Sequence, residues 1–108
     1  MMSNLHLKKD PTLVDYQKYI EEMVIERGFE NVPVEHRFIL FVEEVGELAR
    51  AMRKRLAMSF AEDTKLAELE DEAADVFIYL LDICNKLGVD LEAAFRQKEE
   101  KNKKRVWK

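Results

Sequence analysis

Four acidic side chains have a spacing in this sequence that could support chemistry. Glu44 and Glu47 stand three residues apart in one segment, and Glu72 and Asp75 stand three residues apart in a second. Residues i and i+3 share one face of a helix, so each pair would present two carboxylates on the same side. The sequence therefore predicts two acidic pairs, each on its own helix.

The two pairs are placed symmetrically about residues 59–60. The midpoint of each pair lies about 14 residues from that point, which is roughly 21 Å along a helix at 1.5 Å per residue. The helical pattern weakens at residues 58–61, where we expect a turn. If the helices before and after this turn form an antiparallel hairpin, the acidic pairs face each other at one level.

The angular positions of the acidic residues give a second reason to expect a shared site. At 100° per residue, Glu44 lies beside the apolar stripe of its helix, and Glu72 holds a similar position on the next helix. A carboxylate bordered by apolar side chains is costly unless something compensates it. Four carboxylates close together require protonation, basic side chains or a divalent cation between them.

The ligand types indicate which cation would fit. Oxygen ligands with no nearby His or Cys favour Mg²⁺, with Mn²⁺ as the alternative, over zinc. Carboxylate-bound Mg²⁺ usually keeps positions for substrate phosphates, and one helix face formed by Lys98, Asn102 and Arg105 could bind them. Together these features predict metal-assisted attack of water on a phosphoanhydride. The simpler alternatives are that Glu-x-x-Glu is surface charge and that the basic run favours the C-terminal end of a helix dipole.

Periodicity and capping residues predict four helices that position these side chains. Asp10 as N-cap and Pro11 as first helical residue begin the first helix, and Gly28 ends it. Gly88 ends the third helix, and Asp90 caps the fourth. We expect the second helix to run from about residue 34 to about residue 57, and the third from residue 63 or 64 to about residue 87. Residues 1–9 are expected to form a mobile tail.

Apolar stripes predict which faces of the two long helices are buried. On the second helix the main stripe is Phe38, Phe41, Val42, Val45, Leu48 (or Ala49) and Met52. On the third helix it is Leu66, Leu69, Ala73, Val76, Phe77, Leu80, Ile83, Cys84 and Leu87. We expect Arg50, Arg53 and Lys54 on the outer face. The positions of Glu68, Glu70, Asp71 and Asp82 are more ambiguous, and we expect most of these four on the surface.

Size and composition limit the class of protein. The 108 residues are 37% charged and 47% hydrophobic with three glycines. This composition predicts one all-α domain over 1–108. With the helices described above, we expect a bundle of four to five helices whose central antiparallel pair carries the acidic motifs. So small a helical core favours a homodimer or homotetramer. The net charge of −4 argues against nucleic acid as a partner. The single Cys84 is expected to be a buried thiol in a cytoplasmic protein, with no signal peptide or membrane span.

The ordered motifs resemble the all-α nucleoside triphosphate pyrophosphohydrolases, in particular the MazG-like group. The family pattern is Glu-Glu-x-x-Glu followed after a spacer by Glu-x-x-Asp, and this chain has Glu43-Glu44-Val45-Gly46-Glu47 and then Glu72-Ala73-Ala74-Asp75. The resemblance continues through residues 75–81, 87–91 and the face of Lys98, Asn102 and Arg105, so that it covers roughly residues 35–106.

This resemblance implies a site and a reaction. It implies Mg²⁺ on Glu44, Glu47, Glu72 and Asp75, with hydrolysis between the α and β phosphates to give a nucleoside monophosphate and pyrophosphate. Glu44 would orient or deprotonate the attacking water. Tyr79 matches a position that lines the nucleotide pocket, and Lys98, Asn102 and Arg105 match positions that hold phosphates.

One position departs from the family pattern. Members that prefer deoxycytidine triphosphate carry a tryptophan seven residues after the second glutamate of the first pair, where this chain has Lys54. A relaxed, house-cleaning activity on several or on non-standard nucleotides fits this change better than a preference for one base.

Two other functions remain as alternatives. Phosphoribosyl-ATP pyrophosphohydrolase shares the fold and a similar acidic pattern, but its usual histidine near residues 79–80 is absent here. The other alternative is a non-catalytic helical module that oligomerises or binds a partner, for which the acidic residues would be dispensable.

Overall fold

The chain folds into helices alone in the part that the structure, a computed structural model, describes, namely residues 2–57 and 63–106. The helices are α1 (Leu13–Glu26), α2 (Val34–Ala57), α3 (Asp63–Leu87) and α4 (Leu91–Lys103). This confirms the expected all-α class and the bounds of the second and third helices. The turn expected at 58–61 lies outside the described residues. Within those residues, no helix has the length and apolar character that a membrane crossing requires.

The helix ends follow from local hydrogen bonding. The expected start at Asp10 and Pro11 is wrong, because Thr12 is the N-cap of α1. The Thr12 hydroxyl accepts from the backbone N–H of Asp15 at 3.2 Å, and the Asp15 carboxylate accepts from the N–H of Thr12 at 2.9 Å, a reciprocal capping box. Gly28 and Gly88 follow α1 and α3 with φ of +76° and +70°, a conformation that favours glycine. Asp90 caps α4, as expected, and accepts from the N–H of Ala93 at 3.0 Å.

The core lies where α1 packs against the C-terminal half of α3. Ile20, Met23 and Val24 of α1 form one buried cluster with Leu81, which is fully inaccessible to solvent. Leu5 packs against this cluster from the segment before α1, and the mobility expected for residues 1–9 stays a prediction. Cys84 is buried as expected.

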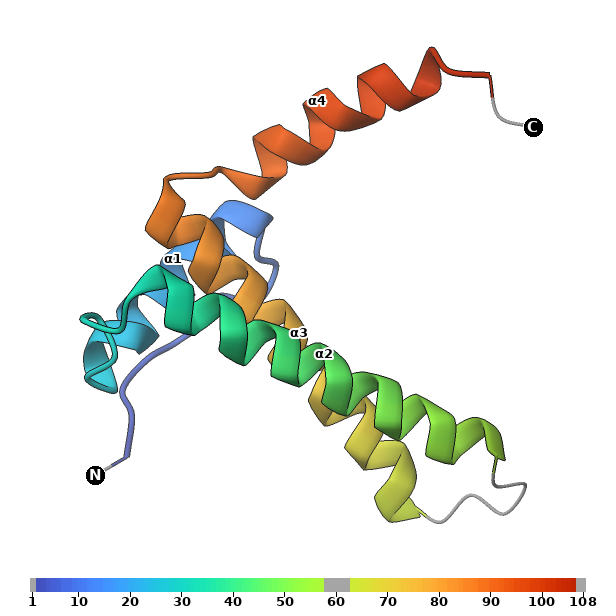
Figure 1. Ribbon diagram of the computed structural model, residues 1–108. Helices are drawn as coiled ribbons and strands as arrows, with labels where there is room; N and C mark the ends of the chain where they lie inside the picture. The colour runs from blue at the N-terminus through green and yellow to red at the C-terminus, as the bar shows by residue number, and fades with distance from the viewer. Residues whose placement is uncertain (1, 58–62, 107–108) are drawn as a thin grey trace.

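The long helices α2 and α3 lie side by side and form one arm of the molecule (Figure 1). The expected burial of the apolar stripe of α2 is wrong in part, since Phe38, Val42, Val45 and Met52 are 54%, 51%, 41% and 49% exposed. The less exposed side of α2 instead carries Arg37, Phe41, Glu44, Leu48 and Ala51. These residues recur every three or four positions, so the buried seam is a helical face rotated away from the apolar stripe.

The stripe expected on α3 is displaced in a similar way. Ala73 and Leu87 are exposed, whereas Leu81 and Asp82, which the pattern leaves out, are buried. The reason is that α3 contacts α2 on one side and α1 on another, so that more than one face of α3 is covered. Leu66 lies outside the described side chains.

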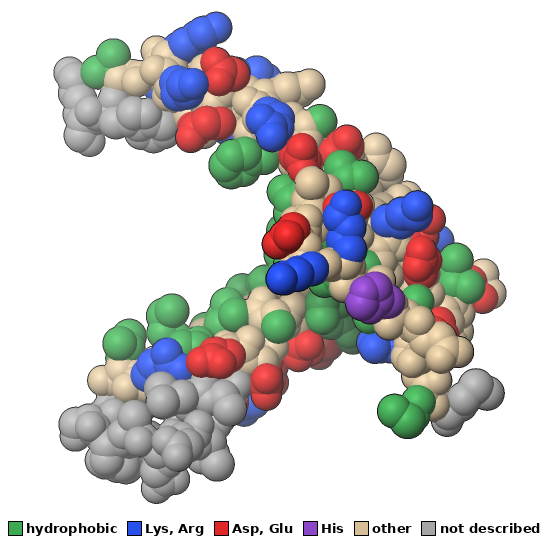
Figure 2. All heavy atoms as spheres, turned by 180° about the vertical axis from the view of Figure 1, so that it is seen from behind, with side chains coloured by type: hydrophobic (Ala, Val, Ile, Leu, Met, Phe, Trp, Pro, Cys, Tyr) green, Lys and Arg blue, Asp and Glu red, His purple; other side chains and the backbone are tan. Residues whose placement is uncertain are grey.

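The single chain is open. Its radius of gyration is 16.6 Å, against about 13 Å for a compact domain of this length. Its accessible surface is 8501 Å², against about 6,300 Å² for a compact monomer of this mass. The cause is visible in Figure 1, where α4 projects from the bundle as a second arm. Figure 2 shows the concave outline between the two arms, with hydrophobic side chains along the arm formed by α2 and α3.

Candidate active site

Three carboxylates from two helices meet in the seam between α2 and α3. Glu44 of α2 and Glu72 and Asp75 of α3 each contribute one oxygen, and these oxygens all lie within 4.8 Å of one another. All three residues are half-buried. Glu44 reaches the site because it lies on the buried face of α2, and Glu72 and Asp75 reach it together because they are three residues apart on α3. We refer to these three residues as the carboxylate cluster.

The surroundings of the carboxylate cluster disfavour the charged form of Glu44. The pKa of Glu44 is raised from 4.5 to about 7, first by burial, then by a hydrogen bond shared with Glu72, and then by the charges of Asp75, Glu72 and Glu47. In addition, Oε2 of Glu72 is buried without a hydrogen-bond partner. An unpaired buried oxygen beside like charges is unfavourable unless a cation binds there. An all-oxygen ligand set of this kind fits Mg²⁺ or Mn²⁺.

Glu47, the fourth acidic residue of the two motifs, lies at the edge of this site. Its carboxylate pairs with the guanidinium of Arg50 one turn later on the same helix. Both side chains of this pair are about half exposed. The structure therefore brings together Glu44, Glu72 and Asp75, while Glu47 is near enough for its charge to act on Glu44.

A cavity of about 330 Å³ adjoins the carboxylate cluster. It shares Asp75 with the cluster, and Tyr79 lines it one turn further along α3. The other lining residues come from α1, the connector between α1 and α2, α2 and α3, and they are Met23, Val24, Arg27, Phe29, Val32, Arg37, Leu40, Ile78 and Asp82. This mixture of apolar walls and a few charged groups is typical of small-molecule pockets.

Tyr79 is placed between this cavity and the acidic groups. Burial raises the pKa of its hydroxyl first, followed by the charges of Glu44, Asp75 and Asp82. The hydroxyl therefore stays protonated at neutral pH and can donate a hydrogen bond into the cavity. The contact of Tyr79 with a nucleotide, which the family resemblance implies, stays a prediction.

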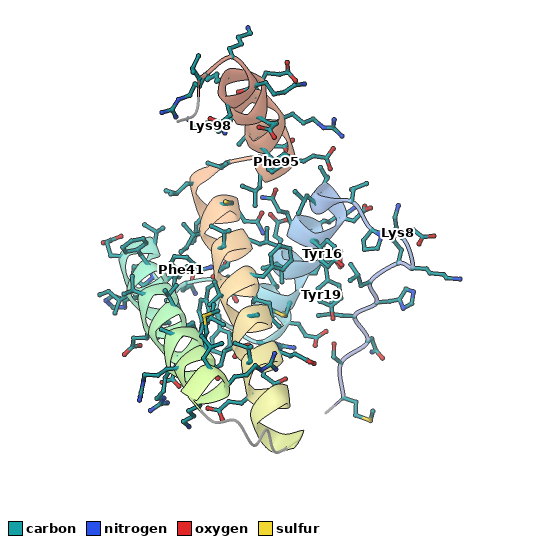
Figure 3. The ribbon with its side chains drawn as sticks, turned by 90° about the vertical axis from the view of Figure 1, so that its right-hand side faces the viewer. Lys8, Tyr16, Tyr19, Phe41, Phe95 and Lys98 are labelled. Atoms are coloured by element: carbon teal, nitrogen blue, oxygen red, sulfur yellow. The ribbon has the colours of Figure 1, made fainter. Side chains whose placement is uncertain are left out.

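The basic residues expected to bind phosphates lie apart from the carboxylate cluster. Lys98 and Asn102 are on α4, and Arg105 follows the end of that helix. The expected helical face is therefore wrong at Arg105, whose N–H donates to the carbonyl of Asn102 at 3.1 Å in a turn. Figure 3 shows Phe95 and Lys98 on the projecting α4 and Phe41 below them on α2.

Two cross-helix ion pairs were missed by sequence reasoning. Asp82, whose position the sequence left ambiguous, is 9% exposed and pairs with Arg37 of α2, which is 3% exposed. Lys54, expected on the outer face, is half-buried, and its Nζ lies 3.3 Å from Oε1 of Glu68 on α3. Nothing in a helical pattern marks such pairs, because both partners are charged and lie on different helices.

Comparison with known proteins identifies the family. Residues 36–107 match the MazG nucleotide pyrophosphohydrolase domain. The dCTP pyrophosphatase 1 of Rattus norvegicus is 33% identical over 104 residues, and that of Mus musculus is 31% identical over 101 residues. Each alignment covers 89% of this chain but 59% of the relative, so the chain spans little more than half the length of these proteins. Because the family match covers most of the chain, this protein belongs to the MazG nucleotide pyrophosphohydrolase domain family.

Proposed function

We propose that the protein is a divalent-metal-dependent nucleoside triphosphate pyrophosphohydrolase. It would convert a nucleoside triphosphate and water into a nucleoside monophosphate and pyrophosphate. The observation that carries this proposal is the convergence of Glu44, Glu72 and Asp75 within 4.8 Å beside a cavity that shares Asp75. Membership of the MazG family supports the same reaction class, and free nucleotides as substrates suit a cytoplasmic location.

The carboxylate cluster is proposed to hold Mg²⁺ or Mn²⁺. Glu44, Glu72 and Asp75 supply oxygen ligands, and Glu47 becomes a fourth ligand once it exchanges its exposed contact with Arg50. When bound, the ion supplies charge stabilisation to the phosphates and lowers the pKa of a coordinated water. The strongest support comes from Oε2 of Glu72, which is buried without a hydrogen-bond partner and could therefore bind the ion.

Glu44 is proposed to orient or deprotonate the attacking water. Burial and the neighbouring acidic groups raise the pKa of Glu44 in the metal-free chain, and a bound cation would lower it again. The role proposed for Glu44 therefore rests on its position in the carboxylate cluster beside Glu72 and Asp75. Tyr79 and the cavity walls would hold the nucleoside, so that the α phosphate lies toward Asp75. The related proteins are called dCTP pyrophosphatases. In this chain Lys54 stands where family members that prefer deoxycytidine triphosphate carry a tryptophan, and it pairs with Glu68. We therefore propose activity on several or non-standard nucleotides.

A second copy of the chain is proposed to complete the assembly. The stripe of Phe38, Val42, Val45 and Met52 is about half exposed along one face of α2, and an apolar row of this length is typical of an interface. Lys98, Asn102 and Arg105 stand on the projecting arm, away from the carboxylate cluster of the same chain. We therefore propose that they bind phosphates at a site that forms when two copies associate as a homodimer or within a homotetramer.

The experiment is product analysis with a panel of standard and modified nucleoside triphosphates in the presence of Mg²⁺ or Mn²⁺. The proposal predicts release of pyrophosphate and a monophosphate, with no orthophosphate. Release of orthophosphate with a diphosphate would overturn the assigned bond. Phosphoribosyl-ATP is included in the panel, and its cleavage alone would favour the alternative of a phosphoribosyl-ATP pyrophosphohydrolase. No cleavage of any substrate would favour the non-catalytic module.

A further inference from the structure

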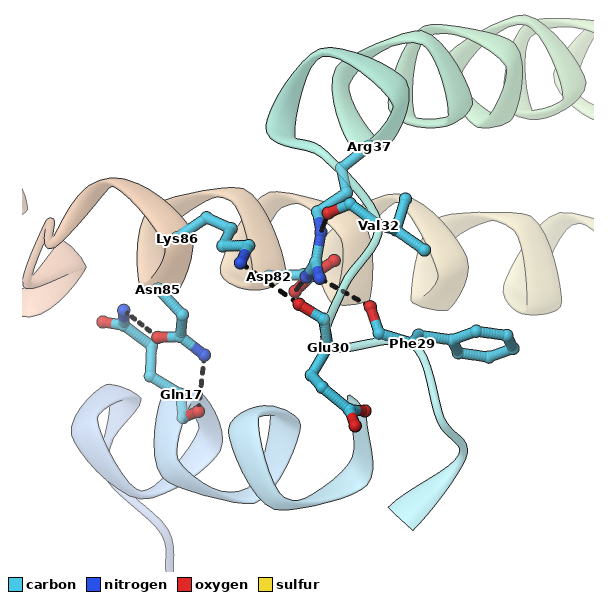
Figure 4. Close-up of polar contacts among 8 residues, drawn as sticks. All are labelled: Gln17, Phe29, Glu30, Val32, Arg37, Asp82, Asn85 and Lys86. Atoms are coloured by element: carbon cyan, nitrogen blue, oxygen red, sulfur yellow. Dashed lines mark hydrogen bonds and ion pairs between the residues drawn. The ribbon is translucent and has the colours of Figure 1, made fainter. Parts of the chain in front are cut away.

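The connector between α1 and α2 is held by one buried arginine. Arg37 on the first turn of α2 donates from Nε to the carbonyl of Val32 at 2.7 Å and from a terminal nitrogen to the carbonyl of Phe29 at 2.6 Å. Its other terminal nitrogen donates to the carboxylate of Asp82 on α3. Figure 4 shows the guanidinium between the connector and α3, with these three acceptors around it.

The chemistry of this contact suits positioning better than stability. A buried ion pair seldom stabilises a fold more than a well-packed apolar pair would, because both charges lose their hydration. A guanidinium, however, presents several donors in a fixed plane and can hold two carbonyls and one carboxylate at once, which a lysine ammonium cannot do in the same geometry. Arg37 is 3% exposed. Its bond to Asp82 is buried, and its bonds to the two carbonyls are partly buried.

Two backbone hydrogen bonds and one exposed lysine also hold the middle of the connector. The N–H of Val32 donates to the carbonyl of Phe29 at 3.1 Å, and the N–H of Phe29 donates back to the carbonyl of Val24 at 2.9 Å. Lys86 donates to the carbonyl of Glu30 at 3.2 Å, but this bond is exposed. The described connector is therefore tied to α3 mainly through Arg37 and Asp82.

The residues that Arg37 holds are also a wall of the cavity beside the carboxylate cluster. Phe29 and Val32 line that cavity together with Asp75 and Tyr79 of α3. The Phe29 ring is 55% exposed, and it is free to contact a flat ligand from this wall. A shift of the connector would change the width of the cavity without moving the carboxylates.

We propose that Arg37, locked by Asp82, is a positioning residue that fixes the Phe29–Val32 connector as the wall of the nucleoside pocket. It sets how tightly a nucleotide binds and which bases are accepted, and it leaves the hydrolytic step to the carboxylate cluster. This inference rests on the proposed function, since it assumes that the cavity holds the nucleoside.

Two variants separate positioning from folding. Arg37→Lys keeps the charge opposite Asp82 but removes the planar fork that reaches both carbonyls. The double variant Arg37→Met with Asp82→Leu removes the pair without leaving a buried unpaired charge. Its loss of stability should therefore be limited to that of the two connector carbonyls, which no longer have their donor. Lys86→Ala is the matched control, because it removes an exposed bond to the same connector.

The kinetic readout is the split between KM and kcat across a panel of nucleoside triphosphates with Mg²⁺. We expect both Arg37 variants to raise KM about tenfold, the scale of one lost hydrogen bond to a charged group, and to narrow the differences between bases. We expect kcat to change by no more than about threefold, because the reacting groups are untouched. The Lys86→Ala control should match the original chain in both constants.

Amide hydrogen exchange gives a readout that does not need activity. Exchange at Phe29 and Val32 should become about tenfold faster in both Arg37 variants, with the amides of α2 and α3 unchanged. Folded variants with unchanged KM and unchanged exchange would overturn the inference. Faster exchange with unchanged KM would also overturn it, because the connector would then move without affecting the nucleotide. If the original chain cleaves no nucleotide while exchange rises as expected, the proposed function fails and the anchoring of the connector stands.

Discussion

Glu44 of α2 and Glu72 of α3 stand 28 positions apart in the sequence and place carboxylate oxygens within 4.8 Å of each other. They share a hydrogen bond that raises the pKa of Glu44, while the second oxygen of Glu72 is buried and unpartnered. Asp75 completes the cluster from the next turn of α3. Two helices thus hold acidic groups at a separation that folding alone would not favour, which is the expected cost of a prepared cation site.

The metal-free chain should lose stability as the pH rises through the titration of Glu44. The pKa of Glu44 is about 7 in the folded chain and 4.5 without perturbation, so between these values the folded state binds more protons than the unfolded state. Its free energy of unfolding therefore falls from about pH 4.5 to about pH 7 and stays lowered above that. We expect Glu44→Gln to remove this fall in melting temperatures measured with a chelator present.

The comparison of the two chains cancels the titration of the other carboxylates. If the melting temperatures of the original chain and of Glu44→Gln change with pH in the same way between pH 4.5 and 8, the groups around Glu44 do not act as described. Mg²⁺ added at pH 8 should raise the melting temperature of the original chain more than that of the variant, since only the former has the full ligand set.

Gln17 should be the most sensitive polar residue of α1. Its buried side-chain amide donates to Oδ1 of Asn85 and to the carbonyl of Val89, both at 2.9 Å, and accepts from the N–H of Leu91 at 2.9 Å. Gln17→Leu leaves these groups at the α3–α4 corner without their partner, which should cost about 2–3 kcal/mol of unfolding free energy. Urea denaturation measures this loss. The exposed neighbour variant Lys18→Gln should stay within about 0.5 kcal/mol of the original chain, and equal losses for the two would contradict the network.

Gly46 should be replaceable with a gain in stability. It lies in the middle of α2, it is exposed, and a Cβ placed there meets nothing within 4 Å. Gly46→Ala should therefore raise the unfolding free energy by about 0.5–1 kcal/mol, because alanine loses less backbone entropy in a helix. Thermal and urea unfolding test this. A loss of stability would mean that another group, such as a second copy, packs against this position.

The apolar stripe of α2 should control association. Val42 is 51% exposed at the centre of that stripe, and Val42→Lys would place a charge inside an interface. Light scattering after size exclusion should show an oligomer for the original chain and a smaller species for the variant. Ile25→Lys, at a residue of α1 that is 59% exposed and outside the stripe, is the control and should keep the original mass. A monomeric original chain would contradict the proposed assembly.

The sequence predicted much of this fold because its signals are local. Periodicity reaches from residue to residue along a helix, and Gly28, Gly88 and Asp90 act within one turn. The meeting of Glu44 with Glu72 and Asp75 was predictable for a similar reason, since equal distances from one turn place residues at the same level of an antiparallel pair. Only Thr12 displaced an expected helix start, because its capping box with Asp15 outweighs Asp10 and Pro11.

Features that depend on several elements could not be predicted in this way. The burial of Arg37 and Asp82 depends on the path of the connector, whose carbonyls supply two of the three acceptors of Arg37. The exposure of Val42 and Val45 arises because the seam with α3 follows Glu44 and Ala51 instead. The side chain of Gln17 also hydrogen-bonds to Val89 and Leu91 at the start of α4, and no helical period contains this contact between distant segments.

The most direct test of the central claim is metal binding by the carboxylate cluster, measured by Mn²⁺ titration and electron paramagnetic resonance of the free ion. The original chain should take up Mn²⁺, and Glu72→Gln should weaken its affinity by about tenfold or more, the scale for loss of an important group at a metal site. Glu70→Gln changes an exposed acid on the same helix and should bind as the original chain does. Equal affinities for Glu72→Gln and Glu70→Gln, or no uptake by the original chain, would contradict the claim that Glu44, Glu72 and Asp75 form a metal centre.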